Sequence, residues 1–179
     1  MICTKEKCTG CYACNNICPK HAITMQEDSF GNIYPEINKE KCIDCNLCRK
    51  VCPQLNNKEV FIIPLKVYAL YTKDKKKREE STSGGAASII YEEIINSNGV
   101  GYGVSNLFNN DDFSFVRIDK LEDIKKIKGS KYVHGYIKDS FKNIKNDLLA
   151  RKKVLFVGTP CQVAGLKSYL MKEYDNLIT

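Results

Sequence analysis

Eight of the ten cysteines form two runs of identical spacing near the start of the chain. The runs are CTGCYACNNICP at 8–19 and CIDCNLCRKVCP at 42–53, and they match at every cysteine and at the closing proline. Thiolates are soft ligands that suit iron and zinc, and the spacing C-x2-C-x2-C-x3-C-P is typical of iron–sulfur proteins. We therefore predict a duplicated unit that binds two 4Fe-4S clusters.

The spacing also predicts which cysteines share a cluster. In such runs the first three cysteines bind one cluster and the fourth binds the other. The predicted sets are Cys8, Cys11, Cys14 with Cys52, and Cys42, Cys45, Cys48 with Cys18. Zinc is the alternative for any C-x2-C pair, but a tetrahedral zinc site does not need this tripled and crossed pattern. Neither set needs Cys3, which we interpret as a half-buried free thiol.

Composition restricts the setting in which these thiols work. The 179 residues contain no apolar run of membrane-spanning length, and the N-terminus MICTKEKC does not resemble a signal peptide. We expect a cytoplasmic protein without a membrane span, where reducing conditions leave thiols free for metal. The net charge of +7 comes mostly from singly scattered basic residues, which argues against nucleic-acid binding. A solvated basic face, or a surface for an acidic partner or a phosphate-bearing cofactor, accounts for it.

The chain divides by pattern into three segments. Residues 1–57 should form an α+β ferredoxin-like double-cluster domain, with a hairpin over 22–37 and EDSFGN as its loop. Residues 58–65 read as a linker. Residues 66–179 alternate strand-like and helix-like stretches, which predicts a partial α/β domain. Its expected strands are 66–73, 99–106, 113–119, 154–158 and 174–179. Its expected helices are one within 81–99, opened by the Ser/Thr/Gly cluster and closed by Asn98-Gly99, and those at 120–128, 138–153 and 160–171. The charged run 73–80 is expected to be a solvated loop and NNDD at 109–112 a turn.

Three short motifs follow the cysteine runs in a fixed order: STSGG at 81–85, GSKY at 129–132 and GTPCQ at 158–162. With the double-cluster unit before them, they make the chain resemble the beta-subunit family of coenzyme F-420 hydrogenases and dehydrogenases. The resemblance implies an iron–sulfur flavoprotein that passes electrons between clusters, FAD and a deazaflavin-type coenzyme, in contact with a redox partner protein or subunit. Related sequences continue with a further strand and a Cys-His-Gly segment, so we expect this chain to be C-terminally truncated.

The motifs supply the candidate cofactor residues Ser81, Ser83, Gly84, Gly85 and Lys131. The first four join a loop to a helix N-terminus, where free N–H groups favour an anion such as a flavin pyrophosphate. An ordinary serine cap followed by glycines would look the same. Lys131 could contact a phosphate or an isoalloxazine oxygen, or it could be a surface lysine.

Cys161 lies far along the chain from the other cysteines, at a strand-to-helix junction after Thr159 and Pro160. That position favours a thiolate and suits a redox or cluster cysteine, while a small core residue is the alternative. Taken together, the sequence predicts a subunit of a flavin-dependent oxidoreductase. The competing hypothesis is a non-catalytic electron carrier or assembly module.

Overall fold

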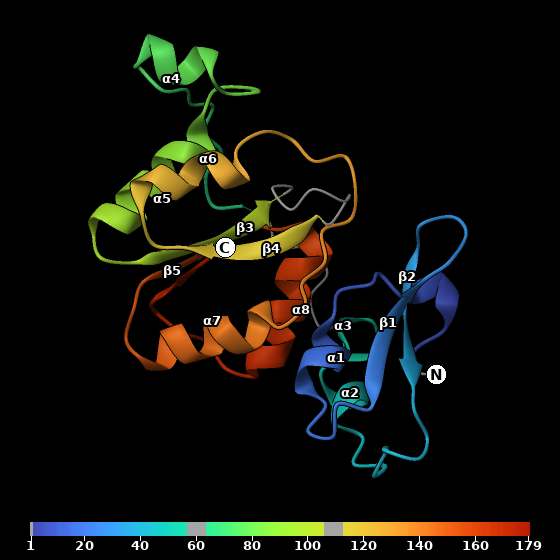
Figure 1. Ribbon diagram of the computed structural model, residues 1–179. Coiled ribbons are helices and arrows are strands. Elements are labelled where there is room, and N and C mark those ends of the chain that lie inside the picture. Colours follow the sequence, from blue (N-terminus) through green and yellow to red (C-terminus); the bar gives the residue numbers. More distant parts are fainter. Residues whose placement is uncertain (1, 57–63, 106–112) are drawn as a thin grey trace. The chain divides into compact units, whose positions relative to one another are not determined.

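The computed structural model describes residues 2–56, 64–105 and 113–179 (Figure 1). The chain divides into two compact units that it enters alternately. The first unit consists of Met1–Val60, Ile137–Lys145 and Gly158–Asp175, and the second of Phe61–Tyr136, Asn146–Val157 and Asn176–Thr179. Most of the expected linker at 58–65 and the expected turn at 109–112 lie outside the described residues. Among the described residues, no helix combines the length and apolar character that crossing a bilayer requires.

The first unit begins with short helices around a two-stranded hairpin. Its N-terminal elements are η1 (Lys5–Lys7), α1 (Ala13–Ile17), β1 (Ile23–Glu27), β2 (Ile33–Ile37), α2 (Leu47–Lys50) and α3 (Pro53–Asn56). β1 and β2 are antiparallel with Ile23 opposite Ile37, which confirms the expected hairpin. Asp28 closes its loop, since the carboxylate accepts hydrogen bonds from the backbone N–H groups of Phe30 and Asn32, both at 2.9 Å.

Two later segments belong to the same unit. Helix α7 (Ser140–Leu149) starts in it, and α8 (Pro160–Leu170) lies wholly within it. Their contact includes the rings of Phe141 and Tyr169, whose centroids are 5.9 Å apart. The side-chain amide of Asn16 in α1 donates a hydrogen bond to the carbonyl of Lys138 at 2.8 Å. The first unit therefore joins the cysteine-rich segment to residues more than a hundred positions later.

A four-stranded sheet organises the second unit. Its strands are β3 (Val100–Ser105), β4 (Ser114–Ile118), β5 (Val154–Phe156) and β6 (Leu177–Ile178), and its helices are α4 (Lys75–Glu79), α5 (Ala86–Asn96), η2 (Leu121–Asp123) and α6 (Ile124–Ile127). The strand order is β4-β3-β5-β6; β3, β5 and β6 are parallel, and β4 is antiparallel to β3. Tyr91, Ile94 and Ile95 of α5 pack on Ile118 and Leu155.

The mixed helices, small sheets and parallel strands are compatible with an α+β chain. The finer assignment, a ferredoxin-like fold followed by a partial α/β domain, stays a prediction.

Two local predictions for the second unit are wrong. Residues 66–73 form no strand; the backbone N–H of Thr72 donates to the carbonyl of Gly84 at 2.8 Å, while Val67 and Tyr68 are exposed. Apolar residues alone do not make a strand without a neighbouring strand to pair with. The charged run at 73–80 contains α4 rather than only a loop, because the Asp74 carboxylate caps the helix by accepting from the N–H of Lys77 at 3.0 Å.

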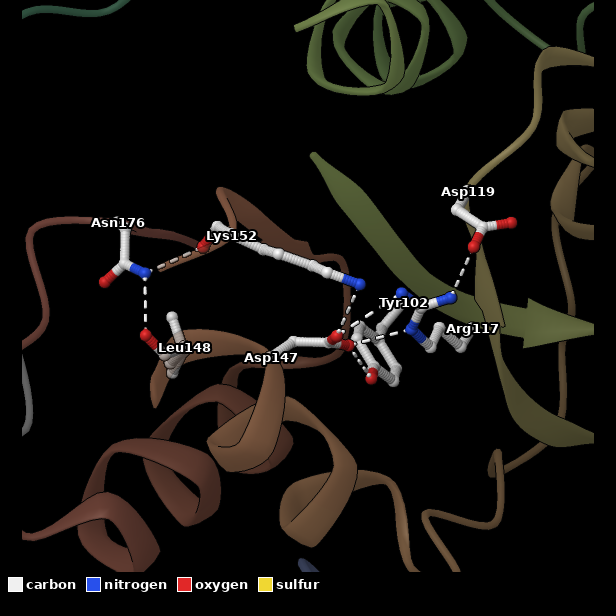
Figure 2. A network of polar contacts seen from close by, with 7 residues as sticks. All are labelled: Tyr102, Arg117, Asp119, Asp147, Leu148, Lys152 and Asn176. Carbon is white, nitrogen blue, oxygen red and sulfur yellow. Dashed lines mark hydrogen bonds and ion pairs between the residues drawn. The ribbon is translucent and has the colours of Figure 1, made fainter. Parts of the chain in front are cut away.

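A polar network connects the sheet of the second unit to the end of α7 (Figure 2). The Asp147 carboxylate accepts hydrogen bonds from the Tyr102 hydroxyl at 2.6 Å and from Arg117 Nε at 2.8 Å. Lys152 Nζ lies 3.3 Å from the same carboxylate. Burial alone would raise the pKa of Asp147, but these donors and charges outweigh it and hold the pKa below its ordinary value. Asp119 pairs with Arg117 from a more exposed position.

Candidate functional site

The two cysteine loops have the same unusual backbone. In the first loop Gly10 and Tyr12 have positive φ angles of 61° and 64°, and in the second Asp44 and Asn46 have φ of 50° and 58°. Both pairs stand at equivalent positions of the repeat. Glycine, Asn and Asp are the residues that tolerate this left-handed conformation best. Alternating right- and left-handed residues turn successive N–H groups toward one concavity, which suits an anionic cluster.

The second loop borders a cavity of about 260 Å³. Cys42, Cys45 and Cys48 line it, and so does Cys18 from the end of the first run. The N–H of Ala22 donates a hydrogen bond to the Cys18 sulfur at 3.3 Å. The structure thus brings together the four residues of one predicted ligand set.

The first loop borders a much smaller cavity, of about 20 Å³. Cys8, Cys11, Cys14 and Cys52 line it together with Cys3. Cys14 and Cys52 are buried, whereas Cys45 at the other cavity is exposed. The predicted set of Cys8, Cys11, Cys14 and Cys52 is therefore also assembled across the repeat, and two of its members are buried. The donor type and the crossed arrangement fit two 4Fe-4S clusters, although the ligand sets themselves stay predictions.

Two predicted ligands of the first cavity, Cys11 and Cys14, have raised pKa values in the metal-free chain. Burial raises the pKa of Cys11 to about 11, against a smaller opposing effect of the Ala13 N–H. Burial and neighbouring thiols raise the pKa of Cys14 still further. A cluster binds thiolates, so its insertion must displace these protons. Among the described residues, no group of three or more His, Cys, Asp or Glu side chains is placed so that it could hold one metal ion.

Cys3 is a residue whose position the sequence did not predict. It lines the same cavity as Cys52 and Cys8, and burial followed by these two thiols raises its pKa to about 12. It is half-buried, as expected, but it belongs to the first cavity rather than standing apart from it.

Cys161 occupies the first turn of α8, inside a capping box. The Thr159 side chain accepts from the backbone of Gln162, and the Gln162 side chain accepts from the Thr159 N–H at 2.9 Å. The Thr159 hydroxyl also lies 3.1 Å from the Cys161 sulfur. The pattern T-x-x-Q signals such a cap and was visible in the sequence. The GTPCQ motif therefore has a structural reason that is independent of any redox role for Cys161.

Helix α8 also lies against the first cysteine loop, within the first unit. A Cβ atom placed on Gly165 would be 3.0 Å from both the Cβ and the carbonyl oxygen of Cys11, and 3.2 Å from its sulfur. Contacts of this length are tighter than nine in ten real Cβ contacts, so with any side chain at 165 the Cys11 loop would have to move by a few tenths of an ångström. The Cys161 thiol is close enough to Cys11 to raise the pKa of Cys11 slightly. The structure thus places Cys161 beside a predicted cluster ligand, one helix turn before the contact at Gly165.

The residues of the STSGG motif lie in the second unit, at the start of α5. Ser81 Oγ donates to the carbonyl of Lys77 at 2.7 Å, and Ser83 is exposed. Gly85 is the N-cap, with φ of 77° and no side-chain cap. Gly84 has structural work as well, because a Cβ there would lie 2.7 Å from the Leu70 carbonyl oxygen. The alternative that a serine caps α5 is therefore wrong. Close packing explains the two glycines without a cofactor.

Lys131 closes the end of α6. Its ammonium donates hydrogen bonds to the carbonyls of Ile127 at 2.9 Å, Lys128 at 2.5 Å and Gly129 at 3.0 Å. Burial lowers its pKa. A Cβ placed on Gly129 would lie 3.8 Å from Thr82 Oγ1, so the GSKY and STSGG loops adjoin each other in the second unit.

Comparison with known proteins assigns one part of the chain. No curated protein matches it. Residues 7–56 match the family of the 4Fe-4S dicluster domain, and this segment holds both cysteine loops. An iron–sulfur electron-transfer role follows for this segment, together with the need for a redox partner. The N-terminal part of the chain is a ferredoxin-type domain that carries the dicluster motif.

Proposed function

We propose that this chain is the electron-transfer subunit of a flavin-dependent oxidoreductase. Residues 1–57 hold two 4Fe-4S clusters, and residues 58–65 are the linker to the second domain. Residues 66–179 form an FAD-binding α/β domain that passes electrons to a deazaflavin-type or other acceptor. The observation that carries the proposal is the assembly of each crossed cysteine set around its own cavity. A cytoplasmic setting keeps these thiols reduced and available for iron.

The chain's own residues would hold the clusters by charge and by geometry. Each loop supplies three thiolates, and the last cysteine of the other run supplies the fourth. The left-handed residues would turn backbone N–H groups toward the cluster sulfurs, which favours their negative charge. When bound, a 4Fe-4S cluster supplies one-electron transfer, and FAD connects such steps to two-electron chemistry.

The adjoining STSGG and GSKY loops support the flavin part of the proposal. Gly129 and Thr82 bring the two loops to one place, at the N-terminal end of the eleven-residue helix α5. The exposed Ser83 hydroxyl and the backbone N–H groups of the first turn are donors that suit a pyrophosphate. Lys131 would have to exchange a carbonyl partner for a cofactor oxygen.

That last requirement favours the second candidate, an electron carrier or assembly module without catalysis. With three carbonyl partners, Lys131 already has one acceptor for each of its protons. A lysine used this way stabilises the end of α6 and needs no flavin. The two candidates share the clusters and differ in the cofactor of the second unit.

Cofactor analysis of anaerobically purified protein separates the candidates. Both require about eight irons per chain. The flavoenzyme also requires about one FAD per chain after reconstitution, measured by equilibrium dialysis. Ser83→Ala should weaken FAD binding by roughly tenfold or more, because hydrogen bonds to charged groups contribute about 1.5–3 kcal/mol. Ser97→Ala, at the opposite end of α5, is the matched control. Iron without FAD binding would leave only the carrier.

A further inference from the structure

The first cavity contains one thiol more than a cluster needs. Cys3 lines it together with the four predicted ligands, and the thiols of Cys52 and Cys8 are near enough to raise its pKa. Ile2, Cys14 and Cys52 form a buried group against which Cys3 packs. A thiol here has a proton to donate, and the sulfurs of the predicted ligands that line the same cavity can accept it.

The backbone around Cys3 is held in place. Ile2 is buried, and its carbonyl accepts a hydrogen bond from the Arg49 guanidinium at 3.1 Å. Ile2 lines both cavities, so the segment lies between the two sites. On the other side, the carbonyl of Thr4 accepts from the N–H of Cys8 at 3.1 Å. The position of Cys3 is therefore fixed from both sides by the domain.

The internal repeat shows what the second site has at the same position. The sequence KEKC occurs at 5–8 and again at 39–42, so the repeat extends upstream of the ligands. The structure agrees, because the Cys42 N–H donates to the Asn38 carbonyl at 3.1 Å just as Cys8 does to Thr4. By this alignment Cys3 corresponds to Ile37, which lines the second cavity. One site has a thiol where the other has an apolar side chain.

We infer that Cys3 is a tuning residue of the first cluster: its thiol donates a hydrogen bond to a ligand sulfur, of Cys52 or Cys8, and raises the reduction potential of that cluster. The inference rests on the proposed function, because it requires both clusters. Ile37 provides no such donor, so the device acts on one cluster of the pair.

The direction of the effect follows from charge. Reduction adds one electron to the cluster; no bond forms or breaks, and Cys3 keeps its proton. The added negative charge strengthens a hydrogen bond to the ligand sulfur, so the donor stabilises the reduced form more than the oxidised form. A gain of tenfold in the reduction equilibrium corresponds to about 59 mV for a one-electron couple. The donor thereby favours an electron on the first cluster.

Three variants of the cluster-loaded full chain test this inference. Cys3→Val removes the donor and keeps the cavity apolar, Cys3→Ser keeps a donor, and Ile37→Cys adds one to the second site. Potentials are measured by anaerobic redox titration followed by electron paramagnetic resonance, with iron counted in each sample. We expect Cys3→Val to make reduction of the first cluster less favourable by up to about tenfold in its equilibrium, which lowers its reduction potential by up to about 59 mV. Cys3→Ser should retain most of the original potential, and Ile37→Cys should raise the other potential.

The outcomes separate this inference from the proposed function. A wild-type chain with one cluster or none would refute the proposed function, and this inference with it. If wild type, Cys3→Val and Ile37→Cys all hold two clusters and neither variant changes the reduction potential of either cluster, the tuning role is overturned. The proposed function then stands. Loss of iron in Cys3→Val would also overturn the tuning role, since Cys3 would then be a ligand. If Cys3→Val does not fold, Ile37→Cys alone still tests the inference. An unchanged reduction potential of the second cluster in that variant would overturn it.

Discussion

Replacing Gly165 by valine should damage the first cluster site and leave the second intact. Gly165 is buried in α8, and any Cβ there meets Cys11 at 3.0 Å. Valine adds two methyl groups beyond that Cβ. Either α8 or the Cys11 loop must then move, and the loop is the part that holds a predicted ligand. The matched control is Ala164→Val, the same new side chain at the neighbouring exposed position.

The expected cost follows from the overlap. Overpacking a filled site costs about 1–3 kcal/mol. Valine is a better helix former than glycine, which returns a few tenths of a kcal/mol. For a chain of this size about 1 kcal/mol shifts the melting temperature by roughly 2–4 °C, so Gly165→Val should melt some 2–10 °C lower. Ala164→Val carries only the helix-propensity loss of about 0.5 kcal/mol.

The assay combines thermal unfolding with cluster spectroscopy under anaerobic conditions. In Gly165→Val the signal of one cluster should broaden, and a chelator should remove its iron faster than from wild type. The signal of the other cluster should be unchanged. Ala164→Val should match wild type in the signals of both clusters. If the two valine variants behave alike, the contact between α8 and the Cys11 loop does not exist as described.

Two further variants test the remaining architecture. Asp147→Asn should lower the free energy of unfolding by about 2 kcal/mol at pH 7, because a charge-assisted hydrogen bond contributes about 1.5–3 kcal/mol and the partly exposed guanidinium reduces that value. The pKa of this carboxyl is lowered in the fold, so its contribution is present above the ordinary value near 4 and lost as the pH falls through the native pKa. Urea titrations should show the difference from wild type shrinking toward pH 3, with Asp119→Asn changing stability by less than about 1 kcal/mol; a pH-independent difference would contradict the network. Thr159→Ala should cost about 1 kcal/mol by removing half of the capping box, with Thr159→Ser restoring it and iron content equal in both; an unchanged melting temperature would refute the cap.

Much of the cluster segment could be predicted because its signals are local and repeated. The spacing of Cys8 to Cys18 and of Cys42 to Cys52 was enough to predict the crossed sets. The hairpin over 22–37 followed from alternation and a turn sequence. Strands such as β3 and β5 are apolar runs that could be recognised without knowing their neighbours.

Other features depend on what lies next to a residue in space. The segment at 66–73 has the composition of a strand but pairs with no strand in the part of the chain that the structure describes. Lys131 looks like a ligand-binding residue until the carbonyls at the end of α6 are seen around it. The predicted ligand count is complete without Cys3, so the cysteine spacing alone assigns it no role. Extending the repeat upstream to KEKC would have paired it with Ile37, but its contact with Cys52 required the fold.

The central claim is that two clusters are held by crossed cysteine sets, and iron counting in double variants tests it most directly. Cys11→Ser combined with Cys52→Ser removes two ligands of the same predicted cluster, so about four irons per chain should remain. Cys11→Ser combined with Cys18→Ser affects both clusters and should leave almost none. Retention of about four irons in the pair with Cys18, and their loss in the pair with Cys52, would contradict the account, because the fourth cysteine of each run would then serve its own loop.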